Sequence, residues 1–266
     1  MCLTFCEVKN KMTEYKVYFD KENKFHFETM VYFCEANDSK RLSFYDLLKL
    51  TSEVAVEDYN QRGMSRDALT ANGFAILVSR ISFRLHRMPR ENEHIVLRTW
   101  EEKAEPLQLV RPYEIESMEK GHEGEKLVSG LSSWLIVNPE TRRIVPTKNF
   151  KMREPTDLQT EHDCLKYGKI QQPENMALFD ERIIKYSDID GNGHTNNARY
   201  GAFVADALPA ELRHADFTDF RLNYAKEAKL GQKMQVFGNI DKESKKLTLV
   251  GKTEEEVSFE AELFWK

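Results

Sequence analysis

One repeated order of elements constrains the fold of this 266-residue chain more than any other feature: a strand, a helix, and then several long strands. In the first half, residues 25–33 alternate in polarity and predict a strand, and an apolar stripe over residues 43–59 predicts a helix. Ser43 and Asp46 have the spacing of a capping box at the start of that helix. Further strands are predicted over residues 75–84, 94–101, 107–117 and 126–137.

The second half repeats this order, with a strand at residues 182–186 and a helix at residues 196–207. Four small residues on the second helix let another backbone approach closely and favour a helix enclosed by its sheet: Ala198, Gly201, Ala202 and Ala205. A helix packed on one face of any α+β sheet has the same periodicity, so this alternative stays open. Strands are predicted over residues 217–228, 233–240, 246–253 and 257–265.

These patterns predict an α+β protein of two similar domains, each an antiparallel sheet wrapped around a central helix. We place the first domain at residues 1–146 and the second, which carries the chemistry, at residues 179–266. Residues 147–178 are polar and show no clear period, which predicts a linker or a wrapped connection. The chain is long enough for two such domains.

Composition argues against several classes of function. With 41% apolar and 31% charged residues the chain is typical of a globular protein, and a net charge of −5 argues against a nucleic-acid-binding domain. Apolar runs such as residues 74–78 are too short to cross a bilayer, and the first residues lack the features of a signal or transit peptide, so we expect a cytoplasmic location. The cysteines have no repeated spacing, which predicts free thiols and no zinc site: Cys2, Cys6, Cys34 and Cys164.

The segment richest in chemistry contains Asp190, Asn192 and His194, which alternate with glycines. In an extended stretch these side chains would share one side. The segment runs into the second helix, which we expect Thr195 or Asn196 to cap, so free N–H groups would face the same cluster and suit a developing oxyanion. Histidine is the natural proton carrier near neutral pH. The chain has no Gly-x-Ser-x-Gly, so water activated by a base is the simpler nucleophile.

Two other interpretations of this segment remain. A loop rich in Gly and Asn before a helix is commonly a turn with caps and nothing more. The spacing Asp188-x-Asp190-x-Asn192-Gly193 also resembles part of a calcium loop, although Arg199 stands where such a loop has its glutamate.

The run Ser-Asp-Ile-Asp-Gly-Asn-Gly-His-Thr-Asn-Asn-Ala-Arg-Tyr at residues 187–200 resembles the signature of acyl-ACP thioesterases, the enzymes that end fatty-acid synthesis. The resemblance extends in weaker form over nearly the whole chain, for example around Trp100, Trp134 and Pro139. It implies a pair of hotdog domains, each a sheet wrapped around a helix, which agrees with the two halves described above.

The resemblance also implies site residues. The family's motif carries over onto Asp190, Asn192 and His194, and its Tyr-x-x-Glu-Cys element reads Tyr-Ala-Lys-Glu-Ala at residues 224–228, which keeps Glu227 and replaces the cysteine by Ala228. A cysteine nucleophile at that position is therefore excluded, and Cys164 in the expected linker is no substitute. We expect hydrolysis without a covalent intermediate, a cofactor or a metal. Glu227 or His194 would take a proton from water, Asp190 would orient the site, and Asn192 with the helix N-terminus would polarise the thioester carbonyl.

Aligning the two helices sets Asp38, Lys40 and Leu42 against the three catalytic residues, so the first half is expected to supply an acyl pocket instead. Candidate pocket residues are Leu48, Met64, Leu69, Ala75 and Leu77. Acyl carrier protein is acidic, so its docking patch should be basic. Candidate patches are Arg142 with Arg143, the cations between Lys148 and Arg153, and Lys185 with Arg199.

Three rival functions use the same fold. An acyl-CoA thioesterase differs only in the carrier, a non-catalytic acyl-binding protein would not need the four polar residues, and a hotdog dehydratase would need a His-plus-acid pair that we do not find in a helix. Acyl chain length and the choice between His194 and Glu227 as base are not fixed by the sequence. Two hotdog units in one chain can pair internally, and a homodimer stays open.

Overall fold

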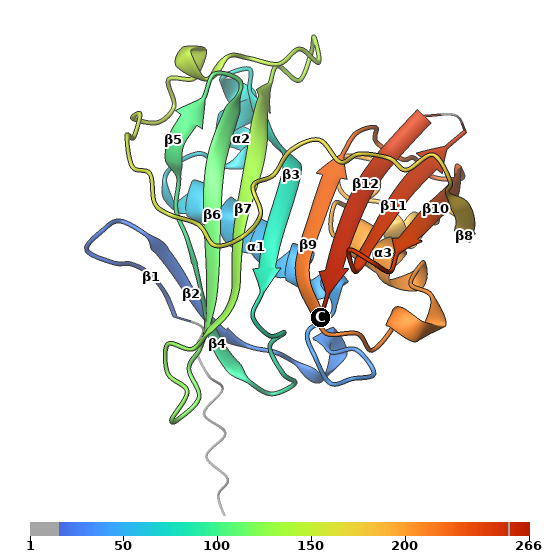
Figure 1. Cartoon of the computed structure of the whole chain (residues 1–266). Helices are drawn as coiled ribbons and strands as arrows, with labels where there is room; N and C mark the ends of the chain where they lie inside the picture. Colours follow the sequence, from blue (N-terminus) through green and yellow to red (C-terminus); the bar gives the residue numbers. More distant parts are fainter. Residues whose placement is uncertain (1–15, 255) are drawn as a thin grey trace, which may run out of the picture.

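The structure is a computed structural model and describes residues 16–254 and 256–266 (Figure 1). Cys2 and Cys6, and with them the question of a zinc site there, lie outside the described residues. Each half has an antiparallel sheet with a helix against it, which confirms the α+β prediction. Within these described ranges no helix combines the length and apolar character needed to span a membrane.

The first half contains α1 (Phe44–Gln61), α2 (Arg66–Ala71) and two short 3-10 helices, η1 (Phe33–Glu35) and η2 (Thr147–Asn149). Its strands are β1 (Val17–Phe19), β2 (Phe25–Met30), β3 (Ala75–Leu85), β4 (His94–Thr99), β5 (Glu102–Glu105), β6 (Gln108–Ser117) and β7 (Lys126–Val137).

The second half contains α3 (Arg199–Asp206) and the short 3-10 helices η3 (Tyr186–Asp188) and η4 (Ala210–Leu212). Its strands are β8 (Ala177–Ile183), β9 (Phe217–Tyr224), β10 (Lys233–Asp241), β11 (Lys246–Thr253) and β12 (Glu256–Trp265).

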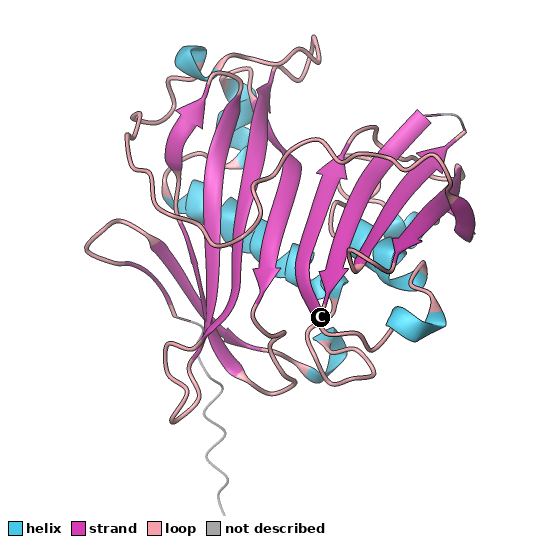
Figure 2. Cartoon of the chain, viewed as in Figure 1, coloured by secondary structure: helices cyan, strands magenta, loops and turns pink. Residues whose placement is uncertain are grey.

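All the strands join one continuous sheet in the order β1-β2-β4-β6-β7-β3-β9-β12-β11-β10-β8, with β5 beside β6. The two halves meet where β3 pairs antiparallel with β9, from Arg80 opposite Asn223 to Arg84 opposite Asp219. Helices α1 and α3 lie on the same side of this sheet (Figure 2) and contact each other. The helices are therefore enclosed by the curved sheet, and the two halves form one body.

Most of the predicted elements are confirmed within a few residues, including the cap of α1. The Ser43 hydroxyl accepts a hydrogen bond from the Asp46 backbone N–H at 3.0 Å, as the capping pattern predicts. Two boundaries were wrong. The strand predicted at residues 182–186 is β8, which runs over residues 177–183 because its register is set by pairing with β10, not by its own alternation. The strand predicted at residues 217–228 ends at Tyr224.

The stretch predicted as a linker is a wrapped connection. Residues 150–176 form no helix or strand and cross the face of the sheet opposite the helices (Figure 1). Hydrogen bonds attach the connection to both halves: the Lys103 N–H donates to the Leu158 carbonyl at 2.8 Å, and the Asn223 side chain donates to the Gly168 carbonyl at 2.9 Å. The domain boundaries given above stay a prediction.

Contact between α1 and α3 depends on Gly201. A Cβ atom at this position would lie 2.6 Å from the carbonyl oxygen of Phe44, at the start of α1. That distance is far below van der Waals contact, and the obstacle is backbone that cannot swing aside. Gly201, one of the four small residues predicted to admit a neighbouring backbone, is therefore required for the close approach of α1.

We predict that Gly201→Ala lowers the free energy of unfolding by about 1–3 kcal/mol, because the added methyl group forces α1 and α3 apart. In an unobstructed helix the same change would stabilise by roughly 0.5–1 kcal/mol. Urea unfolding followed by circular dichroism measures the difference, with Ala202→Ser on the same helix as the control. A stabilised Gly201→Ala protein would show that this contact does not constrain the helices.

Candidate active site

The polar segment predicted to be extended is a tight turn. Ile189 and Thr195 face each other as an isolated β-bridge, and between them the Asp190 N–H donates to the His194 carbonyl at 2.9 Å. The Gly193 N–H closes the turn on the Asp190 carbonyl at 3.0 Å, and Gly193 has φ +80°, a conformation that glycine adopts without strain. The expectation of an extended strand was wrong because the two glycines permit the turn.

Asp190 and Arg66 fix the orientation of Asn192. The Asp190 carboxylate accepts the Asn192 backbone N–H at 2.8 Å and its side-chain Nδ2 at 3.3 Å. On the other side, Arg66 Nη2 donates to Asn192 Oδ1 at 2.7 Å. The carbonyl end of the amide therefore points toward Arg66 and the NH₂ end toward Asp190, which leaves one amide N–H to donate to a ligand.

His194 and Glu227 lie in direct contact. His194 Nε2 is 3.1 Å from Glu227 Oε2, and the same oxygen accepts a hydrogen bond from Arg142 Nη2 at 2.6 Å. The His194 side chain is 25% exposed and the Glu227 side chain 38%, so both are accessible from solvent. The structure thus brings the four predicted site residues into two adjoining groups, the pair Asp190 with Asn192 and the pair His194 with Glu227.

The sequence did not predict that the first half contributes to this site. Arg66 begins α2, and Arg142 lies in the turn after β7, where its own N–H donates to the Asn138 carbonyl. They are 126 and 85 residues away from their partners in the chain, so no local spacing connects them. Because β3 and β9 join the two sheets, these arginines reach across the junction to Asn192 and Glu227.

Three cations expected to lie in docking patches are instead paired with carboxylates. Arg142 contacts Glu227, Arg153 contacts Glu101 at 2.6 Å, and Arg199 contacts Asp188 at 2.7 Å. The last pair argues against the calcium interpretation. Arg199, which stands where a calcium loop has its glutamate, forms an ion pair with Asp188, the first carboxylate of the loop.

The helix that follows the turn does not offer the free N–H groups that we expected. The residue before its first helical residue is Ala198, which has no side-chain cap of its own, and the predicted Asn196 supplies the capping oxygen. The N–H groups of Thr195 and Asn196 donate to the carbonyls of Ala228 and Asp188, and that of Arg199 donates to the Asn196 carbonyl. The Ala198 N–H donates to Asn196 Oδ1 at 2.8 Å. The Asn192 amide keeps one N–H that none of these bonds occupies.

Comparison with protein families agrees with this arrangement. Residues 22–150 match the acyl-ACP thioesterase N-terminal domain, and residues 171–266 match the acyl-ACP thioesterase C-terminal domain. The chain belongs to the acyl-ACP thioesterase family.

Its similarity to individual members of the family is low in sequence. It is 21% identical over 206 residues to the palmitoyl-acyl carrier protein thioesterase of Cuphea hookeriana, covering 73% of this chain and 49% of that protein. It is 22% identical over 194 residues to oleoyl-acyl carrier protein thioesterase 2 of Arabidopsis thaliana, covering 67% of this chain and 52% of that protein. Both of these relatives are chloroplastic, and the chain spans about half of their length.

Solved structures show the same fold. The acyl-ACP thioesterase of Bacteroides thetaiotaomicron superposes with a TM-score of 0.79 at 22% identity, covering 93% of this chain and 100% of that one. The 12:0-ACP thioesterase of Umbellularia californica superposes with a TM-score of 0.77 at 15% identity, covering 91% of this chain and 97% of that one. These matches confirm the double hotdog architecture predicted from the resemblance.

The residue after Glu227 offers a carbonyl and no thiol. Ala228 stands at the position of the family's cysteine and contributes its carbonyl, which accepts hydrogen bonds from the Thr195 N–H and hydroxyl at 2.9 Å. Cys164 lies in the wrapped connection and packs against Val110, Leu131 and Tyr167. Burial, with a smaller contribution from Asp163, raises the pKa of the Cys164 thiol to about 12. The reactive thiolate therefore forms only as the pH approaches that value.

We predict that iodoacetamide at pH 8 modifies exposed Cys34 at least about ten times faster than buried Cys164 in the folded protein. Peptide mass spectrometry measures both rates in one sample. In urea the two rates should converge, since unfolding removes the burial. Equal rates in the folded protein would contradict the inert role assigned to Cys164.

Proposed function

We propose that this protein hydrolyses fatty acyl-ACP thioesters and releases free fatty acid, the step that ends fatty-acid synthesis. The observation that carries the proposal is the contact between His194 and Glu227 beside an Asn192 amide whose orientation is fixed. Membership of the acyl-ACP thioesterase family supports the thioester as substrate.

His194 acts as the general base in this proposal. Glu227 Oε2 already accepts from Arg142 and lies within hydrogen-bond distance of His194 Nε2, which favours the tautomer with the proton on Nε2. Nδ1 is then free to take a proton from water. Glu227 holds the imidazole in place and stabilises the positive charge that it gains.

The remaining steps follow from the geometry of the turn. The water oxygen forms a bond to the thioester carbonyl carbon, and the developing oxyanion accepts a hydrogen bond from the second N–H of Asn192 Nδ2. Asp190 holds that amide in place. When the C–S bond breaks, the proton taken up by His194 passes to the leaving sulfur, and the carboxylic acid product ionises in water. A covalent acyl-enzyme is not required.

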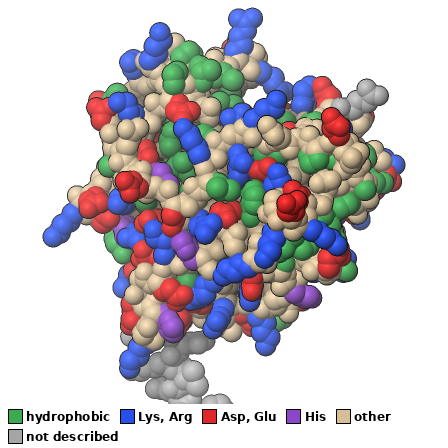
Figure 3. All heavy atoms as spheres, in the orientation of Figure 1, with side chains coloured by type: hydrophobic (Ala, Val, Ile, Leu, Met, Phe, Trp, Pro, Cys, Tyr) green, Lys and Arg blue, Asp and Glu red, His purple; other side chains and the backbone are tan. Residues whose placement is uncertain are grey.

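The proposal also covers the carrier and the cellular location. Exposed cations for an acidic carrier protein include Arg143, Lys148, Lys151 and Lys185, which have no carboxylate partner among residues 16–254 and 256–266. On the face shown in Figure 3, Lys and Arg are interspersed with Asp and Glu. An acyl-CoA thioesterase and a non-catalytic acyl-binding protein stay as alternatives, and a cytoplasmic location and a homodimer stay predictions.

The acyl pocket is proposed to lie in the first half. Leu48, Met64 and Leu69 are buried in its core, as a pocket lining requires. Leu77 is 41% exposed, so its assignment to an interior pocket was wrong: it points outward from β3 just before a bulge after Val78.

We predict that the protein hydrolyses acyl-ACPs faster than the matching acyl-CoAs, and that His194→Ala and Glu227→Ala each lower kcat by at least about 10² without unfolding the protein. A panel of acyl chain lengths, with analysis of the released fatty acids, measures both. Glu227→Gln keeps an oxygen that accepts from His194 and should retain at least about ten times the kcat of Glu227→Ala.

These outcomes separate the alternatives. Near-normal activity of both alanine variants would remove the proposed mechanism. A Glu227→Gln protein as inactive as Glu227→Ala would make the carboxylate itself the base. Faster turnover of acyl-CoA would identify coenzyme A as the carrier. Absence of hydrolysis with every substrate would favour the acyl-binding alternative.

We predict that Arg142 is a positioning residue. Arg142→Ala should lower kcat about tenfold with little change in KM, because Glu227 loses the partner that holds it toward His194. The Arg142 side chain is 66% exposed, so its ion pair contributes little to stability and the melting temperature should be unchanged. Arg143→Ala removes the neighbouring exposed cation and is the matched control. Because Arg143 is one of the proposed docking cations, its loss can change KM, and the comparison rests on kcat. Equal kcat values for the two variants would show that Arg142 does not act on the site.

A further inference from the structure

A second loop reproduces the backbone of the catalytic turn. In the first half, the Asn37 N–H donates to the Arg41 carbonyl at 2.8 Å, the Lys40 N–H donates to the Asn37 carbonyl at 2.9 Å, and the Ser39 N–H donates to Asn37 Oδ1 at 3.0 Å. The same three hydrogen bonds, at 2.9, 3.0 and 2.8 Å, close the turn from Asp190 to His194. The bridge between Ala36 and Leu42 likewise repeats the bridge that flanks the catalytic turn.

This pattern corrects the alignment of the two halves by one residue. Asn37, Ser39 and Arg41 occupy the places of Asp190, Asn192 and His194, whereas the sequence had suggested Asp38, Lys40 and Leu42. The error arose because the first loop has no glycines to mark the turn; Lys40 adopts the positive φ, +56°, that Gly193 has in the second.

Glu227 also has a counterpart in the first half. The Leu42 N–H donates to the Pro89 carbonyl at 2.8 Å, as the Thr195 N–H donates to the Ala228 carbonyl at 2.9 Å. Met88, the residue before Pro89, therefore stands where Glu227 stands in the active site. Arg41 and Met88 stand in place of histidine and glutamate, so this second loop lacks the pair that we propose as catalytic. His214, from the second half, lies 3.0 Å from the Ser39 hydroxyl.

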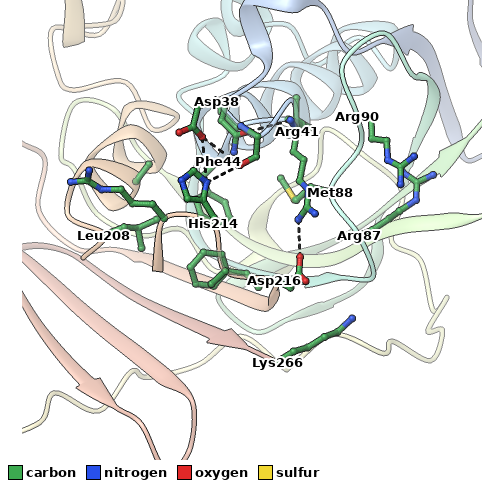
Figure 4. A pocket seen from close by; sticks show the side chains of 18 of the residues that line it. Asp38, Arg41, Phe44, Arg87, Met88, Arg90, Leu208, His214, Asp216 and Lys266 are labelled. Carbon is green, nitrogen blue, oxygen red and sulfur yellow. Dashed lines mark hydrogen bonds and ion pairs between the residues drawn. The ribbon is translucent and has the colours of Figure 1, made fainter. Parts of the chain in front are cut away.

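A cavity of about 430 Å³ lies at this second cleft (Figure 4), a size suited to a small ligand. It is bounded by the loop around Asn37, the turn around Met88, residues 205–217 and the end of β12. Its walls include the apolar side chains of Phe44, Met88, Leu208 and Phe217.

Cations outnumber free carboxylates around this cavity. Arg41 is paired with Asp216 at 2.8 Å, and Arg87 is paired with Glu93 and Glu125. Two other lining cations, Arg90 and Arg213, have no carboxylate partner in the part of the chain that the structure describes. Lys266 lies near Asp216 and interacts with its carboxylate. Of the other lining acids, Asp206 is paired with Arg182, and Asp38 lies 3.8 Å from His214.

We propose that this cavity is a second, non-catalytic site that binds a long-chain carboxylate, with the alkyl chain against the apolar walls and the head group among the unpaired cations. The unpaired arginines favour a carboxylate head through paired hydrogen bonds, and the apolar walls favour an alkyl chain. The cavity is separate from His194 and Glu227, so the proposal stands apart from the catalytic function.

The methyl group of Met88 reports on this cavity directly. Protein labelled with ¹³C at the methionine methyl groups is titrated with decanoate, and the Met88 signal is assigned by its loss in Met88→Leu. We expect the signal to shift and saturate with decanoate, and not with decan-1-ol or with inorganic phosphate. In Arg90→Ala/Arg213→Ala the decanoate concentration at half-saturation should rise at least about tenfold.

The control is Lys120→Ala/Lys242→Ala, which removes two exposed cations away from the cavity and should leave the titration unchanged. An unmoved Met88 signal would overturn the proposal, as would equal affinity in Arg90→Ala/Arg213→Ala. Saturation by phosphate alone would show that the cavity binds a simple anion and not a long-chain carboxylate. Saturation by decan-1-ol alone would show that the cations do not contribute to binding. Hydrolytic activity is not a readout here, so failure of this test leaves the catalytic proposal untouched.

Discussion

The pairing of β3 with β9 is the contact on which the rest of the molecule depends. It turns two curved sheets into one and fixes how the halves face each other, reinforced by the ion pair of Arg84 with Asp219 at 2.9 Å. The proposed active site lies across this junction: the turn and Glu227 belong to the second half, and Arg142 comes from the first. A hotdog unit that carries all four predicted residues would still lack the groups that orient them.

The duplicated loops show that backbone geometry and chemistry are separable in this fold. Both turns are closed by the same hydrogen bonds, and in both an Asx side chain at the first position accepts the N–H two residues on. Asn37 and Asp190 perform that structural task equally well. The residues that differ, Arg41 against His194 and Met88 against Glu227, do not hold the turn together through their side chains. The first loop therefore has the shape of the second without its His-Glu pair.

Most features that depend on residues close together in the chain were predicted from the sequence, and most features that depend on distant residues were not. Long alternating strands and the Ser43 cap of α1 depend on neighbours a few residues away, and both were predicted. The contact of Asp190 with Asn192 is also local, because the two residues are only two positions apart in the chain. Contacts of Arg66 and Arg142 join residues far apart in the chain, and only the pairing of the two sheets brings them together. The alignment of the two loops failed by one residue because it depends on hydrogen bonds that different sequences can form.

The position of Ala228 explains how such a site tolerates the loss of a cysteine. What this residue supplies is its carbonyl, which accepts both donors of Thr195 and ties the segment after β9 to the turn. A carbonyl is common to every amino acid, so replacing cysteine with alanine leaves that attachment intact. Glu227, one residue earlier, stays between His194 and Arg142. A mechanism in which water attacks requires these contacts and no thiol, whereas a covalent mechanism would have been lost with the sulfur atom.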